Sequence, residues 1–140
     1  MKPIDQIQDE IIKEFSAFDE WENKYKLLIE MGNNLFPLPE QYKTTNNLIA
    51  GCQSRVWLHA DFSDDKIIYQ ADSDSLIARG IIFLLIRILS NHSPKEILNA
   101  NLYFIDATGL KTHLTPIRSN GLVAMLKQMK LYALAFKATN

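Results

Sequence analysis

The single cysteine of the chain, Cys52, is the residue best suited to nucleophilic chemistry. It follows Gly51, which permits unusual backbone angles, and precedes the polar residues Gln53 and Ser54, so we expect it where a loop meets a strand. A cysteine thiolate attacks electrophilic centres, although a lone cysteine is more often a small buried apolar residue. One cysteine excludes an intramolecular disulfide, a CxxC redox pair and a multi-cysteine zinc site within these 140 residues.

His113 and Arg118 are the next candidates, because both fall in one predicted loop before the last helix. An imidazole transfers protons and a guanidinium binds anions. A structural role fits equally well: Ser119 would cap the last helix and Arg118 would bond loop carbonyl groups. His59 and His92 have no partner at metal-ligand spacing, so no metal site is expected.

Composition and motifs exclude several classes of protein. The chain has 140 residues, 47% of them hydrophobic, and a net charge of −1, so nothing favours binding to nucleic acid or to an anionic membrane. Its longest apolar run, Ile81–Ile86, is six residues, against the roughly 20 that a membrane helix needs. There is no secretory signal pattern, which favours a cytoplasmic protein. Phosphate-binding glycine motifs, a GxSxG elbow and catalytic carboxylate pairs are lacking.

Hydrophobic periodicity predicts one α+β domain over residues 1–140, with a small antiparallel sheet of about three strands covered by helices. The strands are expected at Ser54–Phe62 and Ile67–Ala71, joined by a turn at residues 63–66, with a shorter one at Leu48–Ala50. A polar segment, Leu35–Asn47, forms a long loop before them.

The helices are predicted from apolar spacing and capping residues. Two form a hairpin over Asp5–Phe18 and from N-cap Asp19 to Gly32. A nearly all-apolar one covers Leu76–Leu89, with N-cap side chains and favourable negative charge expected from residues 72–75, Asp72-Ser73-Asp74-Ser75. Ser93 opens a capping box with a helix to Asn99, and another short helix runs from Leu102 to near Gly109. A polar loop, Leu110–Ile117, precedes the last helix, whose apolar stripe is Leu122, Met125, Leu126, Met129, Tyr132 and Phe136.

Four segments resemble the SufE family, the sulfur-acceptor proteins of iron–sulfur cluster assembly. Residues 51–58 resemble its GCQSxVW signature and residues 21–25 its WE-x-[KR]-Y helix, while residues 72–74 with Gly80 resemble its DSD…G helix start and residues 113–122 its HLTPSRSxGL motif. The match runs in order from about Phe15 to Lys130. Ile117 and Ser75 depart from the usual pattern, and neither is expected to contact Cys52.

The resemblance implies a SufE/NifU (IscU-like) fold and a function in sulfur transfer. Cys52 would accept persulfide sulfur from a SufS- or CsdA-like cysteine desulfurase, stimulate that enzyme, and pass the sulfur to a SufBCD-like scaffold. The chain itself would not be an enzyme and would hold no cofactor, because the pyridoxal phosphate belongs to the desulfurase. Gly51, Gln53, Asp74, His113 and Arg118 would support the loop or bind the partner. The SufE and CsdE subfamilies, and a monomer or a homodimer, remain open.

Sulfur transfer also suits a lone cysteine. Without a second thiol in the chain, a Cys52 persulfide cannot be discharged internally as a disulfide. Because exposed thiolates and persulfides oxidise readily, Cys52 is expected to rest in an apolar pocket and to turn outward when the desulfurase binds.

Two other functions compete with sulfur transfer. Cys52 and His113, 61 positions apart, could form the dyad of an NlpC/P60-type thiol hydrolase, although such a cysteine usually begins a helix. The chain could instead be a non-catalytic interaction domain with an inert cysteine.

Overall fold

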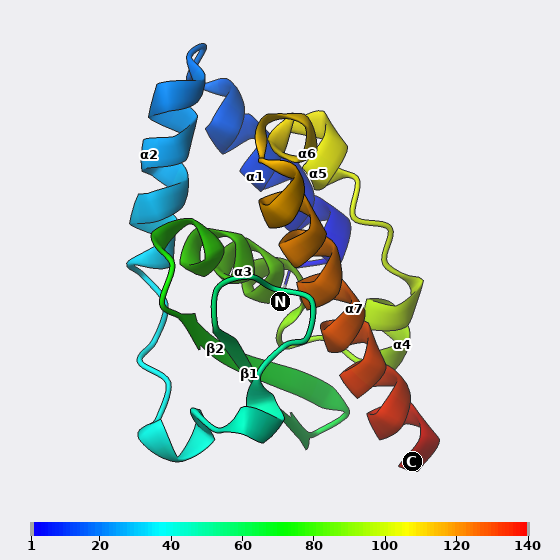
Figure 1. Cartoon of the computed structure of the whole chain (residues 1–140). Coiled ribbons are helices and arrows are strands. Elements are labelled where there is room, and N and C mark those ends of the chain that lie inside the picture. Colours follow the sequence, from blue (N-terminus) through cyan, green and yellow to red (C-terminus); the bar gives the residue numbers. More distant parts are fainter. Residues whose placement is uncertain (1, 140) are drawn as a thin grey trace.

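The computed structural model describes residues 2–139 and confirms the α+β class (Figure 1). The helices are α1 (Ile4–Ser16), α2 (Trp21–Gly32), α3 (Leu76–Leu89), α4 (Pro94–Asn99), α5 (Phe104–Ala107), α6 (Leu110–His113) and α7 (Pro116–Thr139). The strands are β1 (Val56–Ser63) and β2 (Lys66–Ser73), and two short 3₁₀ helices, η1 (Glu40–Tyr42) and η2 (Thr45–Asn47), lie in the connection before β1.

The sheet has two strands in the described part of the chain, so the predicted third strand is wrong. β1 and β2 pair antiparallel from Val56 opposite Ser73 to Ser63 opposite Lys66. Asp64 and Asp65 have positive φ angles of 54° and 59°, the geometry that joins two twisted strands tightly. Leu48 forms only an isolated bridge to Trp57, because the chain turns away at Gly51 before a ladder can continue.

The predicted alternation along the strands is confirmed, and it attaches the sheet to the helices. The buried apolar strand residues are Val56, Leu58, Ile67, Tyr69 and Ala71. The Tyr69 hydroxyl donates to the Met129 carbonyl oxygen at 2.6 Å, and the rings of Phe62 and Phe136 stack with centroids 5.2 Å apart. These contacts hold α7 against the inner face of the sheet, so α7 is fixed relative to the residues that precede β1.

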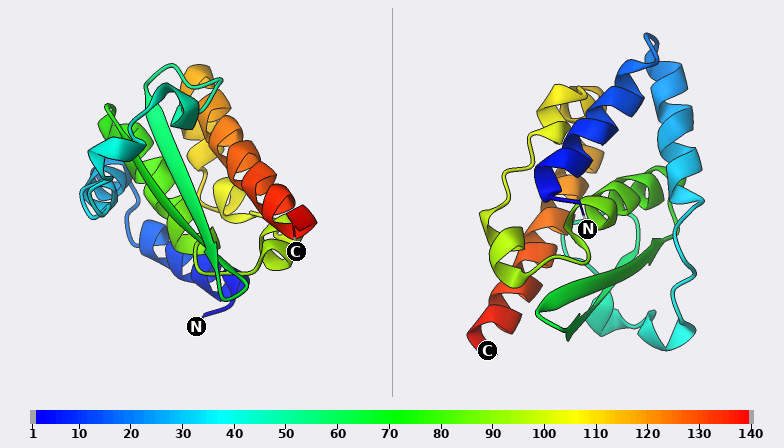
Figure 2. Two further views of the ribbon diagram at one scale, coloured as in Figure 1. Left: turned by 90° about the horizontal axis from the view of Figure 1, so that it is seen from below. Right: turned by 180° about the vertical axis from the view of Figure 1, so that it is seen from behind.

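Seen from behind, α3 lies between the α1–α2 hairpin and the two strands (Figure 2). The backbones of α2 and α3 approach closely at two glycines. A Cβ atom added to Gly80 would lie 2.3 Å from the Leu28 carbonyl oxygen, and one added to Gly32 would lie 2.7 Å from the Gly80 nitrogen. No side chain fits at either position, so these glycines set the spacing between the hairpin and α3.

The helix ends differ from prediction at several points. Asp19 does not cap α2, whose N-cap is Glu20. Of the four candidates at residues 72–75, Ser75 is the N-cap of α3, and its hydroxyl accepts the Ala78 N–H at 3.3 Å. The Ser93 capping box is confirmed, with both of its bonds at 3.1 Å.

The segment predicted as a polar loop before the last helix is largely helical. It contains α6, because Gly109 adopts a left-handed conformation (φ 78°) that lets a new turn begin directly after α5. α7 starts at Pro116, so Ser119 lies inside this helix rather than capping it.

Candidate functional site

Cys52 lies on a short loop that folds over the first turns of α7 (Figure 1). The base of the loop is closed where the Ile49 N–H donates to the Val56 carbonyl oxygen at 2.9 Å. Gly51 has a φ angle of +90°, which residues with a side chain rarely adopt, and a Cβ atom there would meet the Ala124 methyl group at 3.3 Å. Gly51 therefore lets the loop turn tightly enough to bring Cys52 onto α7.

The Cys52 thiol is half-buried and points at the backbone of α7. Its S–H group donates to the Gly121 carbonyl oxygen, with the sulfur 3.7 Å from that oxygen, and a Cβ atom on Gly121 would lie 3.8 Å from the sulfur. A pocket of about 70 Å³ opens beside the thiol. It is lined by Cys52, Gln53, Ser54, Val56, Ser75, Ala78, Ile81, Arg118, Gly121 and Met125.

Burial of the Cys52 side chain raises the pKa of its thiol. Desolvation disfavours the charged thiolate, whereas a cation acting on the sulfur would lower the pKa. The resting cysteine is therefore a protonated thiol at neutral pH, hydrogen-bonded to a carbonyl group and poorly suited to attack while the loop stays closed.

The structure brings Arg118 to the Cys52 pocket and keeps His113 away from it. Arg118 lies exposed in the first turn of α7 and lines the same pocket as Cys52 and Gln53. His113 is at the end of α6, where its ring stacks on Trp21 with centroids 3.9 Å apart.

The hydrogen bonds of His113 connect it to α2 and to the residue before α6, outside the Cys52 pocket. Its Nδ1 lies 3.0 Å from the Gly109 carbonyl oxygen, and its own carbonyl oxygen accepts the Tyr25 hydroxyl. The ring is therefore occupied in joining α2 to α6. A Cys–His dyad, which a thiol hydrolase requires, is not formed in this arrangement.

Asp74 supports the end of the Cys52 loop. Its carboxylate accepts the Arg55 backbone N–H at 3.1 Å and the Arg55 Nε–H at 3.3 Å. The Ser73 hydroxyl adds a bond to the Arg55 carbonyl oxygen at 2.7 Å. These bonds fix the residue at which the loop enters β1, so the role of Asp74 is loop support rather than the predicted helix capping.

Asp72 is likewise not a helix cap, and it anchors the long connection before the Cys52 loop. Its Oδ2 lies 3.3 Å from Lys43 Nζ, and its Oδ1 lies 3.2 Å from Arg79 Nε, an ion-pair contact without hydrogen-bond alignment. Nearby, the rings of Tyr42 and His59 stack with centroids 3.7 Å apart. The predicted loop at residues 35–47 is therefore attached to the strands through η1 and the residue after it.

Seven residues that line the pocket were not predicted as site residues: Ser54, Val56, Ser75, Ala78, Ile81, Gly121 and Met125. Ser75 corrects an expectation directly, because a residue thought to lie away from Cys52 lines its pocket. The pocket is apolar at Val56, Ala78, Ile81 and Met125 and polar at Gln53, Ser54, Ser75 and Arg118. The signal for Gly121 was present, since it is the glycine of the HLTPSRSxGL-like segment at residues 113–122. The side chain of Ile117 lies outside the part that the structure describes.

Residues 2–139 contain neither a metal-binding cluster nor a membrane-spanning helix. No three His, Cys, Asp or Glu side chains gather there in a way that could hold a metal ion. His92 is buried, with its two ring nitrogens 3.0 and 2.9 Å from the carbonyl oxygens of Ser90 and Lys2. No helix in this range is both long enough and apolar enough to span a membrane.

Comparison with known proteins assigns the family. Residues 9–133 match the family described as "SufE: Fe-S metabolism associated domain". The chain therefore belongs to the SufE family, which places it in iron–sulfur metabolism, and the resemblance read from the Cys52 loop is confirmed.

Two relatives support this assignment, and one solved structure has the same fold. The chain is 40% identical over 138 residues to SufE-like protein 1, chloroplastic/mitochondrial, of Arabidopsis thaliana, covering 96% of this chain and 37% of that protein. It is 38% identical over 127 residues to an uncharacterized SufE-like protein of Synechocystis, covering 91% of this chain and 80% of the relative. A hypothetical protein from Thermus thermophilus shares the fold, with a TM-score of 0.77 at 22% identity over 96% of this chain and 97% of that one.

Proposed function

We propose that Cys52 accepts a sulfane sulfur from the persulfide of a pyridoxal-phosphate cysteine desulfurase and carries it to an iron–sulfur scaffold. The observation that carries this proposal is the position of the thiol, beside a pocket at the surface and within a loop closed by hydrogen bonds at both ends. Such a thiol is protected at rest and becomes accessible by movement of a few residues.

The transfer is a substitution at sulfur. The Cys52 thiolate attacks the terminal sulfur of the donor persulfide, a new S–S bond forms, and the donor cysteine leaves as a thiolate. The electrons balance without an external oxidant or reductant. Cys52 must first lose the proton that it donates to Gly121, so the loop has to open before transfer and the desulfurase supplies the surface that favours the thiolate.

The pocket also suits the product of this reaction. The terminal sulfur of a Cys52 persulfide needs space beside the existing sulfur atom, and the pocket of about 70 Å³ adjoins it. Ser54 and Ser75 can donate hydrogen bonds there, while Met125 offers a polarizable apolar contact. With no second cysteine in the chain, the persulfide persists until another protein takes the sulfur.

In this proposal the chain is a sulfur carrier and activator rather than an enzyme, and it holds no cofactor of its own. Removing sulfur from the desulfurase frees the enzyme for its next turnover, which explains stimulation without a second active site. A reducing compartment such as the cytoplasm would keep Cys52 available as a thiol.

Stimulation of the desulfurase tests the proposal. Sulfide or alanine production by the purified desulfurase is measured with increasing amounts of the wild-type protein and of Cys52→Ser. Wild type should raise the rate several-fold and Cys52→Ser should not, because a serine hydroxyl cannot form a persulfide. Full stimulation by a folded Cys52→Ser protein would refute the acceptor role.

A further inference from the structure

The outer face of α7 carries an exposed ridge that plays no part in the Cys52 pocket. We define the α7 ridge as Val123, Lys127, Leu131 and Leu134, which follow one another at spacings of four, four and three residues and so lie along one side of the helix. Val123, Leu131 and Leu134 are 54%, 47% and 54% exposed. Among the side chains of residues 2–139 that the structure describes, which leave out that of Ile117, these are three of the seven large apolar ones that are exposed. Their shared side of one helix makes them a cluster.

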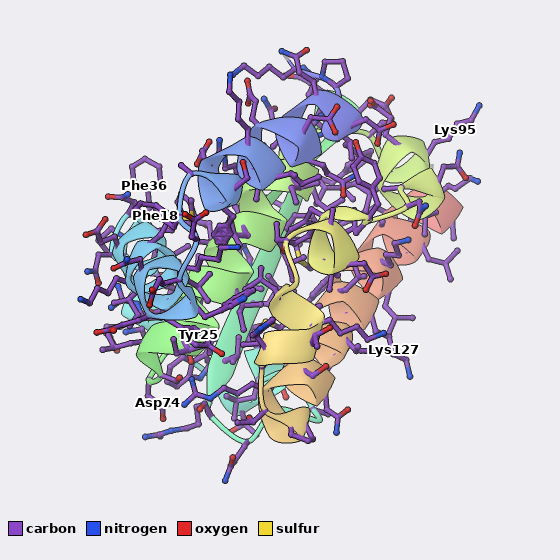
Figure 3. All side chains as sticks on the ribbon, turned by 90° about the horizontal axis from the view of Figure 1, so that it is seen from above. Phe18, Tyr25, Phe36, Asp74, Lys95 and Lys127 are labelled. Carbon is purple, nitrogen blue, oxygen red and sulfur yellow. The ribbon has the colours of Figure 1, made fainter. Side chains whose placement is uncertain are left out.

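The α7 ridge faces away from the cysteine. Gly121 and Met125 of α7 line the Cys52 pocket, and Val123 and Lys127 lie two residues either side of Met125, about 200° around the helix. Lys127 points away from the body of the protein, on the side opposite Tyr25 and Asp74 (Figure 3). A protein that covers Cys52 therefore leaves the α7 ridge free.

The charged residues of α7 are all cationic. Between Pro116 and Thr139 there are four cationic residues and no Asp or Glu, although the whole chain has a net charge of −1. Lys127 and Lys137 have no carboxylate partner within ion-pair distance in residues 2–139. Unpaired cations beside exposed aliphatic side chains complement an acidic surface that also has apolar groups.

A surface hollow adjoins one end of the α7 ridge. It has a volume of about 170 Å³ and is lined mainly by the apolar side chains of Leu102, Ile105, Leu122, Val123 and Leu126. Its polar lining residues are Asp106, Lys111 and Ser119, one acid, one base and one hydroxyl, so the hollow itself carries no net charge. This volume accepts one aliphatic or aromatic side chain of a partner, which would anchor the contact in the way that buried interface residues do.

We propose that the α7 ridge docks the protein that consumes the Cys52 sulfur, through an acidic surface with apolar side chains on that protein. This inference rests on the proposed function, because a carrier must meet a donor and a consumer at the same cysteine. Since the ridge and the cysteine lie on opposite sides of α7, the consumer stays bound while the desulfurase covers Cys52, and the sulfur passes on once the desulfurase leaves.

Binding of the purified scaffold complex to the full-length protein tests the proposal. Leu131→Glu and Lys127→Glu should each weaken binding about tenfold, and Lys127→Glu should also reduce its salt dependence. The controls are Lys13→Glu on α1 and Ile68→Glu on β2, which make the same changes at exposed positions outside the ridge and should bind as wild type does. If Leu131→Glu fails to fold, Lys127→Glu alone tests the docking proposal, because the side chain of Lys127 is exposed.

Several results would overturn the proposal. Unchanged scaffold binding in both ridge variants would show that the α7 ridge does not dock the scaffold. Loss of desulfurase stimulation in these variants would assign the ridge to the donor. Sedimentation showing a wild-type dimer that Leu131→Glu dissociates would assign it to a second copy, and ridge-dependent binding to vesicles of anionic lipid would assign it to a membrane. Loading of Cys52 with sulfur is measured separately by intact mass, so failure of the acceptor role is distinguished from failure of the ridge.

Discussion

The sulfur of Cys52 lies 3.7 Å from the carbonyl oxygen of Gly121, with the thiol donating. Gly121 belongs to α7, whereas Cys52 belongs to the loop before β1, so this single bond joins two segments that are far apart in the chain. It favours the protonated thiol, as burial does. Opening the loop therefore breaks the bond, hydrates the sulfur and permits ionisation in one movement, which couples access to reactivity.

Gly121→Ala should reduce sulfur loading without destabilising the fold. The added methyl group would lie 3.8 Å from the Cys52 sulfur, where it occupies space that the terminal sulfur needs. Alanine in a helix interior is more stable than glycine by about 0.5–1 kcal/mol, so thermal stability should hold or rise. Intact mass after incubation with a desulfurase measures loading, and a fully loaded Gly121→Ala protein would show that the pocket does not hold the persulfide.

The pH dependence of alkylation should reveal the buried thiol. Because burial raises the pKa of Cys52, reaction with iodoacetamide should reach half its maximal rate above the pH of about 8.5 expected for free cysteine. Adding the desulfurase should shift this midpoint down. A midpoint at or below the free-cysteine value in the isolated protein would contradict the closed state.

The same pKa shift has a consequence for stability. The unfolded chain releases the thiol proton near pH 8.5, before the folded chain does, so the contribution of Cys52 is present below about pH 8.5 and is lost as the pH rises through the folded pKa. The difference in unfolding free energy between wild type and Cys52→Ala, measured as a function of pH, separates the contribution of Cys52 from those of the other titrating groups.

Arg118→Ala should weaken desulfurase docking and leave the resting thiol unchanged. Arg118 is exposed at the mouth of the pocket, while the Cys52 pKa is raised rather than lowered, so the guanidinium is better placed to meet a carboxylate of the partner. The concentration for half-maximal stimulation should rise about tenfold, equivalent to about 1.4 kcal/mol. Slower alkylation of the isolated variant would instead indicate that Arg118 activates the sulfur.

Gly80→Ala should destabilise the whole protein. Its Cβ atom would lie 2.3 Å from the Leu28 carbonyl oxygen, and a backbone atom of a packed helix cannot move aside cheaply. We expect a loss of about 3 kcal/mol, measured by urea unfolding. Gly121→Ala is the matched control, since it adds the same methyl group to a helix with space for it, and equal stability of the two variants would contradict the packing argument.

Local patterns predicted much of this fold. Alternation identified the buried residues of β1, and the Ser93-to-Glu96 spacing identified a capping box whose bonds are both formed. The absence of the third strand could not be predicted from the sequence, because a single positive φ angle at Gly51 ends the pairing. α6 was missed because Leu110–His113 is one turn long, too short for a periodic pattern.

The candidate site was predicted only in part, for a related reason. The sequence motifs singled out Cys52, Asp74 and Arg118, yet which side chains meet depends on the packing of α7 against the loop. His113 illustrates this point. It lies five residues before Arg118, but its ring stacks on Trp21 of α2, a contact that no local pattern encodes.

Detection of a transferred sulfur atom on Cys52 is the most direct test of the claim that this residue is the sulfur acceptor. The protein is incubated with the desulfurase and isotopically labelled free cysteine, separated without reductant, alkylated, digested and examined by mass spectrometry. The acceptor role predicts one labelled sulfur atom on the peptide that contains Cys52, and none when the desulfurase is omitted or Cys52 is replaced by serine. A Cys52 peptide that carries no added sulfur while the desulfurase turns over at a stimulated rate would contradict it.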